Sequence, residues 1–386
     1  MSPSGATSAR PRVSVPFVDL APSNQPLKEA ILAEIESLID ASAYVNGPQV
    51  GAFEQAFAGF VGVPHCVGVS SGTDALRLAL MAVDLLPGDE VVVPANTFIA
   101  TVEAVVQAGG RPVVADVSET DYNLDPAVVE AVVGPRTRAL LPVHLYGQLA
   151  QMTRLAALAE SRQLTIIEDA CQAHGAKRDD LTAGAVGRAA AFSFYPGKNL
   201  GAIGDAGAVV TSDPEIAARV RSLRDHGQRE KYRHDVLGYT ARLDSVQALV
   251  LLRKLPSLDA WNTERAATAR YYAESLAGVG DLVLPPVPPG SRPVWHLYVV
   301  RTGRSNELRA FLGDLGIATG RHYPVPVHLT PACAYLGHAE GSFPVAEVLS
   351  RELVSLPIYP GISEPQLDAV VRGVRSFFAS SESVRA

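Results

Sequence analysis

Seven short apolar runs alternate with helical patterns between residues 65 and 212, and this alternation limits the possible folds more than any other feature of the chain. The runs lack polar–apolar alternation, which indicates burial on both faces, as in parallel sheets. The stretches between most of them carry apolar residues at three- and four-residue spacing, which is typical of helices. We therefore predict an α/β fold with a mostly parallel seven-stranded sheet flanked by helices. The predicted strands are Cys66–Val69, Val91–Pro94, Pro112–Asp116, Ala139–His144, Thr165–Asp169, Ala189–Phe194 and Gly207–Thr211.

The last two runs are joined by a connection that is too short for a crossover helix, so we expect one antiparallel neighbour in the sheet. Long helices are predicted over 214–225 and 242–278. A proline-rich stretch over 284–293 is interpreted as a linker or surface loop. The remainder predicts a smaller α+β domain, with a strand at Trp295–Val300 and helices at Asn306–Leu315 and Glu364–Phe378.

These patterns predict three regions along the chain. Residues 1–14 read as a disordered tail, because they lack the apolar core of a signal peptide. Residues 15–250 form the large α/β domain, with a helix over 27–41 bridging it to the rest. Residues 251–386 form the small C-terminal domain.

Composition excludes several classes of partner. The formal net charge of −7 leaves no basic field for nucleic acid or an anionic membrane. No apolar run approaches the roughly 20 residues that span a bilayer. Cys66, Cys171 and Cys333 lie far apart, which argues against a disulfide framework or a zinc site. We expect a reducing compartment, the cytoplasm.

Reactive side chains follow several of the predicted strands. In open α/β sheets, ligands bind outside the carboxyl ends of the strands. Ser71-Gly72-Thr73 follows the first strand, Asp169 ends the fifth, and Lys198 follows the sixth. The first motif suits a phosphate at a helix N-terminus, although an ordinary N-cap turn is the simpler reading.

The other two groups also have two readings each. Asp169 suits a protonated ring nitrogen, or else it caps the next turn or pairs with an arginine. Lys198 is a nucleophile if it is partly desolvated, or else an exposed loop lysine. Together the three sites define one ligand with a phosphate, a ring nitrogen and an aldehyde. Further residues fit that ligand: Phe98 for its ring face, Ser193 for its phosphate and Gln172 for its ring hydroxyl.

With these residues, the sequence resembles the fold type I pyridoxal-phosphate enzymes, and more narrowly the sugar aminotransferases of the DegT/DnrJ/EryC1/StrS family. The resemblance covers the chain from Val15 to about Phe378. The segments that carry it include 47–54, 71–76, 94–98, 142–147, 168–175, 193–201 and 242–248.

The resemblance implies a role for each matching residue. Lys198 is the catalytic lysine that carries pyridoxal 5'-phosphate and shuttles the proton. The cofactor-binding residues are Gly72, Thr73, Phe98, Asp169, Gln172, Ser193, Asn199 and Thr240, and no metal is implied. The family is dimeric, and each active site is completed by the partner chain. Thr240 stands where the family has an asparagine that reaches the neighbouring phosphate, so either its hydroxyl or Tyr239 takes over that contact.

Two segments, 194–201 and 321–329, resemble enzymes that aminate C3 of dTDP-3-keto-6-deoxyhexoses, with L-glutamate as the donor. The implied activity is therefore a sugar-nucleotide transaminase in deoxyaminosugar biosynthesis. The candidate substrate-binding residues are Tyr195, Tyr232, Tyr239, His322 and His328, the last two being equally compatible with structural histidines.

Three other readings stay open. In the first, the enzyme acts at C4 of a nucleotide ketosugar or on a cyclic ketone. In the second, it dehydrates or aromatises its substrate, although dehydratase relatives tend to have histidine in place of Lys198. In the third, the chain is a catalytically silent partner protein, which the intact Lys198, Asp169 and Gln172 disfavour. A dinucleotide enzyme is disfavoured because no G-x-G-x-x-G follows the first strand.

Overall fold

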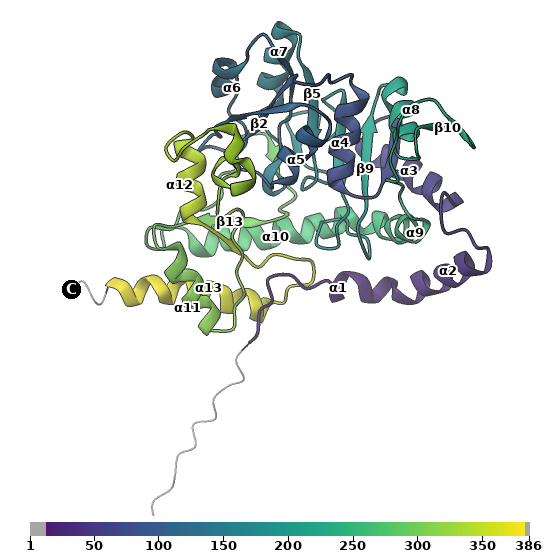
Figure 1. Ribbon diagram of the computed structural model, residues 1–386. Coiled ribbons are helices and arrows are strands. Elements are labelled where there is room, and N and C mark those ends of the chain that lie inside the picture. Colours follow the sequence, from purple (N-terminus) through teal and green to yellow (C-terminus); the bar gives the residue numbers. More distant parts are fainter. Residues whose placement is uncertain (1–12, 383–386) are drawn as a thin grey trace, which may run out of the picture.

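A computed structural model describes residues 13–382 of the chain (Figure 1). The predicted tail, residues 1–14, therefore lies outside the described residues except for its last two positions. Within residues 13–382, no helix combines the length and apolar character needed to cross a membrane.

The centre of the molecule is a seven-stranded sheet with the strand order β1-β9-β8-β5-β4-β2-β3. Every pairing is parallel except those of β9, which runs antiparallel to both β8 and β1. The predicted mostly parallel sheet and its one reversed strand are confirmed. The strands are β1 (His65–Val69), β2 (Glu90–Pro94), β3 (Arg111–Ala115), β4 (Thr137–Leu140), β5 (Thr165–Asp169), β8 (Ala189–Ser193) and β9 (Gly207–Thr211).

The fourth strand is shorter than predicted. β4 ends at Leu140 rather than at His144, because Pro142 has no N–H to continue the ladder. The chain stays beside β5, and Val143 forms an isolated parallel bridge with Asp169. Residues 143 and 144 therefore still reach the carboxyl end of the sheet.

Helices cover both faces of this sheet, as the unbroken apolar runs predict. Neighbouring residues of one strand face opposite layers: Val209 packs in one core and Val210 in the other. One layer contains α4 (Gly72–Ala82), α5 (Ala100–Gln107) and α8 (Pro214–Leu223). The opposite layer contains α3 (Pro48–Val61), α6 (Pro126–Val132), α7 (Met152–Arg162) and α9 (Ser245–Lys254).

The predicted helix over 242–278 is wrong as a single element. It is divided into α9, a 3-10 turn η3 (Leu255–Ser257) and α10 (Leu258–Leu276). Pro256 lies in the turn, where its missing N–H and its ring are incompatible with a continuing α-helix. Figure 1 shows α10 running below the sheet toward the C-terminal elements.

A third core joins α10 to the C-terminal elements. Tyr272 packs there with Val300, Leu312 and Val374. Its framework is the antiparallel pair β13 (Tyr298–Arg301) and β14 (Leu353–Leu356) with α11 (Ser305–Asp314) and α13 (Glu364–Glu382). The helix α12 (Pro344–Glu352) packs instead on the first core through Ala346 and Leu349. These elements confirm a mixed α and β C-terminal part.

Smaller elements complete the described chain. The helix α2 (Lys28–Asp40) packs on α9 through Ile31 and Leu38. The predicted division of the chain into a large domain, residues 15–250, and a small domain, residues 251–386, stays a prediction. The proline-rich stretch is mostly irregular, but β12 (Ser291–Arg292) pairs with β6 (Lys177–Arg178). The remaining elements are α1 (Ala21–Asn24), η1 (Gln25–Leu27), η2 (Leu145–Gly147), β7 (Leu181–Thr182), β10 (Gln228–Glu230), β11 (Arg233–His234), η4 (Val327–Leu329) and η5 (Pro331–Leu336).

Candidate active site

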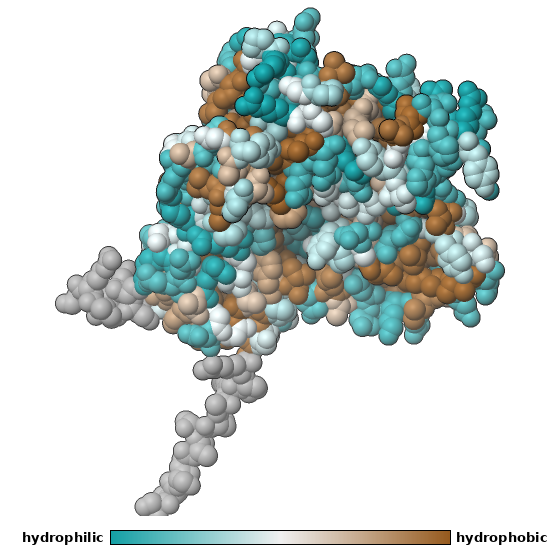
Figure 2. Space-filling model, in the orientation of Figure 1, coloured by the Kyte–Doolittle hydropathy of each residue, from teal (hydrophilic) through white to brown (hydrophobic). Residues whose placement is uncertain are grey.

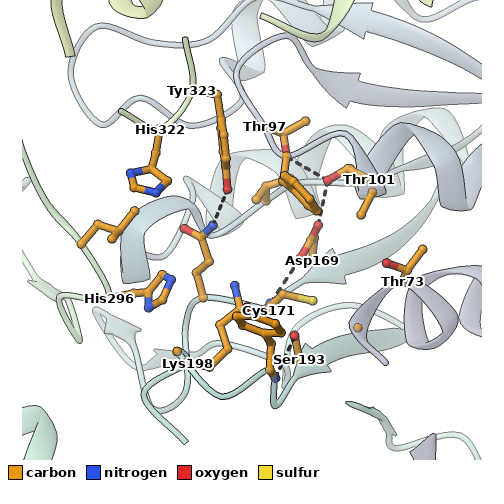
Figure 3. Close-up of a pocket in the computed structure, with 18 of the residues that line it drawn as sticks. Thr73, Thr97, Thr101, Asp169, Cys171, Ser193, Lys198, His296, His322 and Tyr323 are labelled. Atoms are coloured by element: carbon orange, nitrogen blue, oxygen red, sulfur yellow. Dashed lines mark hydrogen bonds between the residues drawn. The ribbon is translucent and has the colours of Figure 1, made fainter. Parts of the chain in front are cut away.

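A cavity of ≈ 480 Å³ lies at the carboxyl ends of β5 and β8, where ligands of α/β folds bind (Figure 3). Its walls come from α4, from the loop after β8 and from residues 322–323 of the C-terminal part. The structure brings nine of the predicted site residues to this cavity: Gly72, Thr73, Phe98, Asp169, Gln172, Ser193, Tyr195, Lys198 and His322.

The N-terminus of α4 opens one side of the cavity. Ser71 is the N-cap residue, and its Oγ accepts a hydrogen bond from the backbone N–H of Asp74 at 3.1 Å. The first N–H groups of a helix have no intrahelical acceptor, so those of Gly72 and Thr73 are available to an anion. A Cβ on Gly72 would lie 2.6 Å from Cβ of Ser193, so only glycine allows this close approach. The arrangement fits a phosphate.

Ser193 ends β8 beside this helix. Its Oγ accepts a hydrogen bond from the backbone N–H of Tyr195 at 3.3 Å. The hydroxyl hydrogen is therefore free to donate to a phosphate oxygen. Tyr195 lines the cavity with 59% of its surface exposed.

Asp169 ends β5 and is 6% exposed. Its Oδ2 accepts from the hydroxyl of Thr101 at 2.9 Å, and its Oδ1 accepts from the backbone N–H of Cys171 at 3.2 Å. No ion pair of Asp169 occurs within residues 13–382. A buried carboxylate that faces a cavity without a cationic partner fits a protonated pyridine nitrogen.

Lys198 lies on the loop between β8 and β9, and its backbone N–H donates to the carbonyl of Tyr195 at 2.8 Å. Burial lowers the pKa of its amine below the ordinary 10.5, and the nearby Cys171 and Asp169 oppose that effect only in part. A less basic amine loses its proton more readily and becomes a nucleophile. Figure 3 shows Lys198 reaching into the cavity from below Asp169 and Cys171.

Gln172 connects the two sides of the cavity. Its Oε1 accepts from the backbone N–H of Tyr146 at 2.7 Å, and its Nε2 donates to the hydroxyl of Tyr323 at 3.2 Å. The Tyr323 ring lies 5.7 Å from the ring of Phe98. Phe98 is 53% exposed and presents an aromatic face at the rim of the cavity.

His322 lies on the opposite wall from Asp169 (Figure 3). Its Nδ1 is 2.8 Å from Oγ of Ser355, and its ring stacks on Phe17 at 5.6 Å. Burial, then the positive charges of Lys198 and Arg309, lower its pKa to about 4. His322 is therefore a neutral ring at physiological pH, suited to hydrogen bonding with a polar substrate.

Sequence reasoning missed several residues that line the cavity. Thr101 lies one helical turn after Thr97 and bonds to its hydroxyl at 2.8 Å, so this spacing beside the Asn96-Thr97-Phe98 motif was a usable signal. Cys171 lies between two predicted site residues. Arg265 and His296 had no such signal, because they reach the cavity only through the tertiary fold.

Five predicted site residues do not line the cavity of this chain. Asn199 turns away from it and donates to the carbonyl of Val294 at 2.8 Å. Buried His328 bonds through Nε2 to Glu347 at 3.0 Å, which leaves it in a structural position. The other three are Tyr232, which is 82% exposed in the turn between β10 and β11, Tyr239, which packs 3.9 Å below the guanidinium of Arg77, and Thr240, whose Oγ1 is 3.1 Å from Nε2 of His226.

Comparison with known proteins places the chain among the aminotransferases. The model of the DegT/DnrJ/EryC1/StrS aminotransferase family matches residues 25–375. The dTDP-3-amino-3,4,6-trideoxy-alpha-D-glucose transaminase of Streptomyces venezuelae is 49% identical over 363 residues, which cover 94% of this chain and 96% of that protein.

Solved structures agree with the sequence matches. The crystal structure of S. venezuelae DesV has a TM-score of 0.92 and 49% identity, over 94% of this chain and 98% of that one. The Bacillus subtilis structure of ntda with bound cofactor PMP has a TM-score of 0.88 and 30% identity, over 96% and 86% of the two chains.

Proposed function

Since the chain belongs to the DegT/DnrJ/EryC1/StrS aminotransferase family, we propose that it transfers an amino group to C3 of a dTDP-3-keto-6-deoxyhexose. Its cofactor is pyridoxal 5'-phosphate. The observation that carries the proposal is the arrangement of Lys198, Asp169 and the open end of α4 around one cavity. These three groups match an aldehyde, a ring nitrogen and a phosphate.

When bound, the cofactor supplies an electron sink for the carbon that exchanges its amino group. Asp169 would hold the ring nitrogen, while the backbone N–H groups of Gly72 and Thr73 and the hydroxyl of Ser193 would hold the phosphate. Gln172 would lie beside the ring hydroxyl and Phe98 against the ring.

Lys198 moves the proton in both halves of the reaction. Lys198 as a whole residue is partly exposed, but burial of its amine lowers the pKa, so the neutral form that accepts a proton is reached at lower pH than in a free lysine. The surrounding walls, with Leu297 and Ile358 among the apolar residues, limit the access of water to this proton.

The test is a panel of dTDP-linked ketosugars offered with L-glutamate, with identification of the product. We expect 2-oxoglutarate to accumulate in proportion to a sugar aminated at C3. Amination at C4, or of a cyclic ketone, would support the second reading. Loss of water from the sugar without 2-oxoglutarate would support the dehydratase reading. Since the S. venezuelae relative is named for a 3,4,6-trideoxy sugar, the panel includes sugars with and without a C4 hydroxyl.

We also propose that the chain works as a homodimer with shared active sites. Large apolar side chains are exposed on α2, in the segment that follows it and in the hairpin region, among them Ile39, Val45 and Leu237, which is 95% exposed. Figure 2 shows apolar residues gathered along α2. Exposed apolar surface of this kind is typical of association sites. The proposed contact of Thr240 or Tyr239 with the partner's cofactor site stays a prediction.

Sedimentation of the unsubstituted chain and of Leu237→Asp tests the homodimer. We expect a dimer that the substitution weakens, because a buried unpaired carboxylate is costly. Leu86→Asp is the matched control, since Leu86 is 63% exposed but precedes the amino end of β2, away from the hairpin. A monomeric unsubstituted chain would contradict the proposal.

We propose the cytoplasm as the place of this reaction. Cys66, Cys171 and Cys333 are free thiols. Free thiols fit a reducing compartment.

A further inference from the structure

A chain of side-chain amides runs behind the cavity and ends at His296. The amide nitrogen of Asn262 donates to the carbonyl of His174 at 2.9 Å, and its Oδ1 accepts from Nδ2 of Asn199 at 2.9 Å. The same Nδ2 also donates to the carbonyl of Val294 at 2.8 Å. Carbonyl oxygens only accept hydrogen bonds, so both amides have one possible orientation.

This orientation fixes the tautomer of His296. The Oδ1 of Asn199 is 3.2 Å from Nδ1 of His296, and an amide oxygen only accepts. Nδ1 must therefore carry the hydrogen, which leaves Nε2 of a neutral ring without one. Burial lowers the pKa of His296 well below 6.5, and the charges of Lys198 and Arg265 lower it further, so the ring stays neutral.

The backbone around His296 is held on both sides. Nη1 of Arg265 donates to the carbonyls of Trp295 and His296 at 3.2 and 3.4 Å. The backbone N–H of Val294 donates to the carbonyl of Gly147 at 2.9 Å, and a Cβ on Gly147 would lie 2.9 Å from the backbone nitrogen of His296. The ring direction is thus set by the fold rather than by solvent.

His296 lines the cavity on the wall that also carries His322 and Tyr323 (Figure 3). Its Nε2 has no hydrogen-bond donor among residues 13–382. A bare acceptor in a cavity that takes a sugar is matched by a hydroxyl group, which can donate. The neighbouring Lys198 marks the place of the reacting carbon, so the matching hydroxyl belongs to the sugar ring close to its keto carbon.

We propose that Nε2 of His296 accepts a hydrogen bond from a ring hydroxyl of the ketosugar and so selects among sugars. The inference rests on the proposed function and names one residue that reads the substrate. It also assigns Asn199 a positioning role, because Asn199 sets the tautomer of His296 without touching the cavity.

Two substitutions of His296 distinguish the roles of its two ring nitrogen atoms. His296→Asn keeps an amide near Nδ1 and removes the acceptor, whereas His296→Gln places an amide oxygen near Nε2. We expect His296→Asn to raise the KM for the ketosugar about tenfold, the loss of one hydrogen bond. His296→Gln should recover most of that loss. The rate of the glutamate half-reaction, followed by its absorbance change, should move less than about twofold. His65→Asn, at the far end of β1, is the matched control.

The sugar panel identifies the hydroxyl. For the analogue that lacks the recognised hydroxyl, His296→Asn should add less than about a twofold effect, since the partner is already gone. An effect of His296→Asn that is equal for every analogue would overturn the proposal, as would a change confined to the glutamate half-reaction.

A spectroscopic readout separates this inference from the proposed function. In ¹⁵N-histidine-labelled holoenzyme, with His296→Asn for assignment, we expect one ring with Nδ1–H and a bare Nε2 from about pH 6 to about pH 8. Saturation with a dTDP-ketosugar should shift the bare Nε2 resonance. An Nε2–H tautomer, no shift at saturation, or no binding of any ketosugar would overturn the inference. Ketosugars that bind and shift the resonance without being aminated would instead overturn the proposed function alone.

Discussion

Thr101 donates its hydroxyl hydrogen to Oδ2 of Asp169 over 2.9 Å, and both groups are almost fully buried. The bond joins the first turn of α5 to the carboxyl end of β5. Thr97 continues the network at 2.8 Å from the Thr101 hydroxyl. The uncharged Thr101 thereby holds the carboxylate of Asp169 in its orientation toward the cavity.

The first prediction concerns this bond. Thr101→Val keeps the shape of the side chain and removes a hydrogen bond to a charged group, worth about 1.5–3 kcal/mol. We expect the affinity of the apoenzyme for pyridoxal phosphate to fall by about tenfold or more, measured by spectrophotometric titration. Thr263→Val is the matched control, because that exposed hydroxyl bonds only to its own helix at Asp259. Equal affinities for both variants would contradict the role given to Thr101.

The second prediction concerns the close approach at Gly72. A Cβ there would meet Ser193 Cβ at 2.6 Å and Cys171 Sγ at 3.0 Å, so Gly72→Ala must displace the helix end that faces the phosphate. We expect a loss of about 1–3 kcal/mol in the free energy of unfolding and weaker cofactor binding. Gly51→Ala in α3 meets nothing within 4 Å and should be neutral or stabilising. The free energies of unfolding of both variants, measured by urea unfolding, test this prediction.

The sheet and the first half of the site were predictable, because the apolar runs and the residues after them are local patterns. Lys198, Asp169 and Ser71-Gly72-Thr73 each follow a strand, and strand ends meet at one edge. His296 was not predictable in this way, since its tautomer depends on Asn199, which lies 97 residues earlier in the chain. The break at Pro256 was readable in principle, but helical periodicity on both sides concealed it.

The third prediction distinguishes two buried lysines. Borohydride should fix the cofactor covalently on Lys198, and peptide mapping should find the label there. Lys254 is also buried, and burial lowers its pKa to about 8, but its amine donates to the carbonyl of Gly201 and lies outside the main cavity. A lowered pKa alone therefore does not decide which lysine binds the cofactor. The position of Lys198 in the main cavity does. Label on Lys254, or label that persists in Lys198→Ala, would overturn the assignment.

The last prediction is a pH dependence of stability that arises from His174. This ring is fully buried against Phe57, Phe192 and Phe194, and burial, then the charge of Lys198, lowers its pKa from 6.5 to about 3. Between these values the unfolded chain binds a proton that the folded chain does not. The free energy of unfolding should therefore fall as the pH drops from 6.5 toward 3, by up to about 1.4 kcal/mol per pH unit for this group.

His174→Gln isolates that contribution. The glutamine amide can still donate to the carbonyl of Ser193, which Nε2 of His174 approaches at 3.0 Å, but it does not titrate. Urea unfolding at several pH values should show a slope in the acid range reduced by about one proton, with the remaining slope due in part to His296 and His322. His234→Gln, in the exposed hairpin strand β11, is the matched control. An unchanged slope in His174→Gln would mean that His174 takes up a proton in the folded chain, and its burial would then not control its charge.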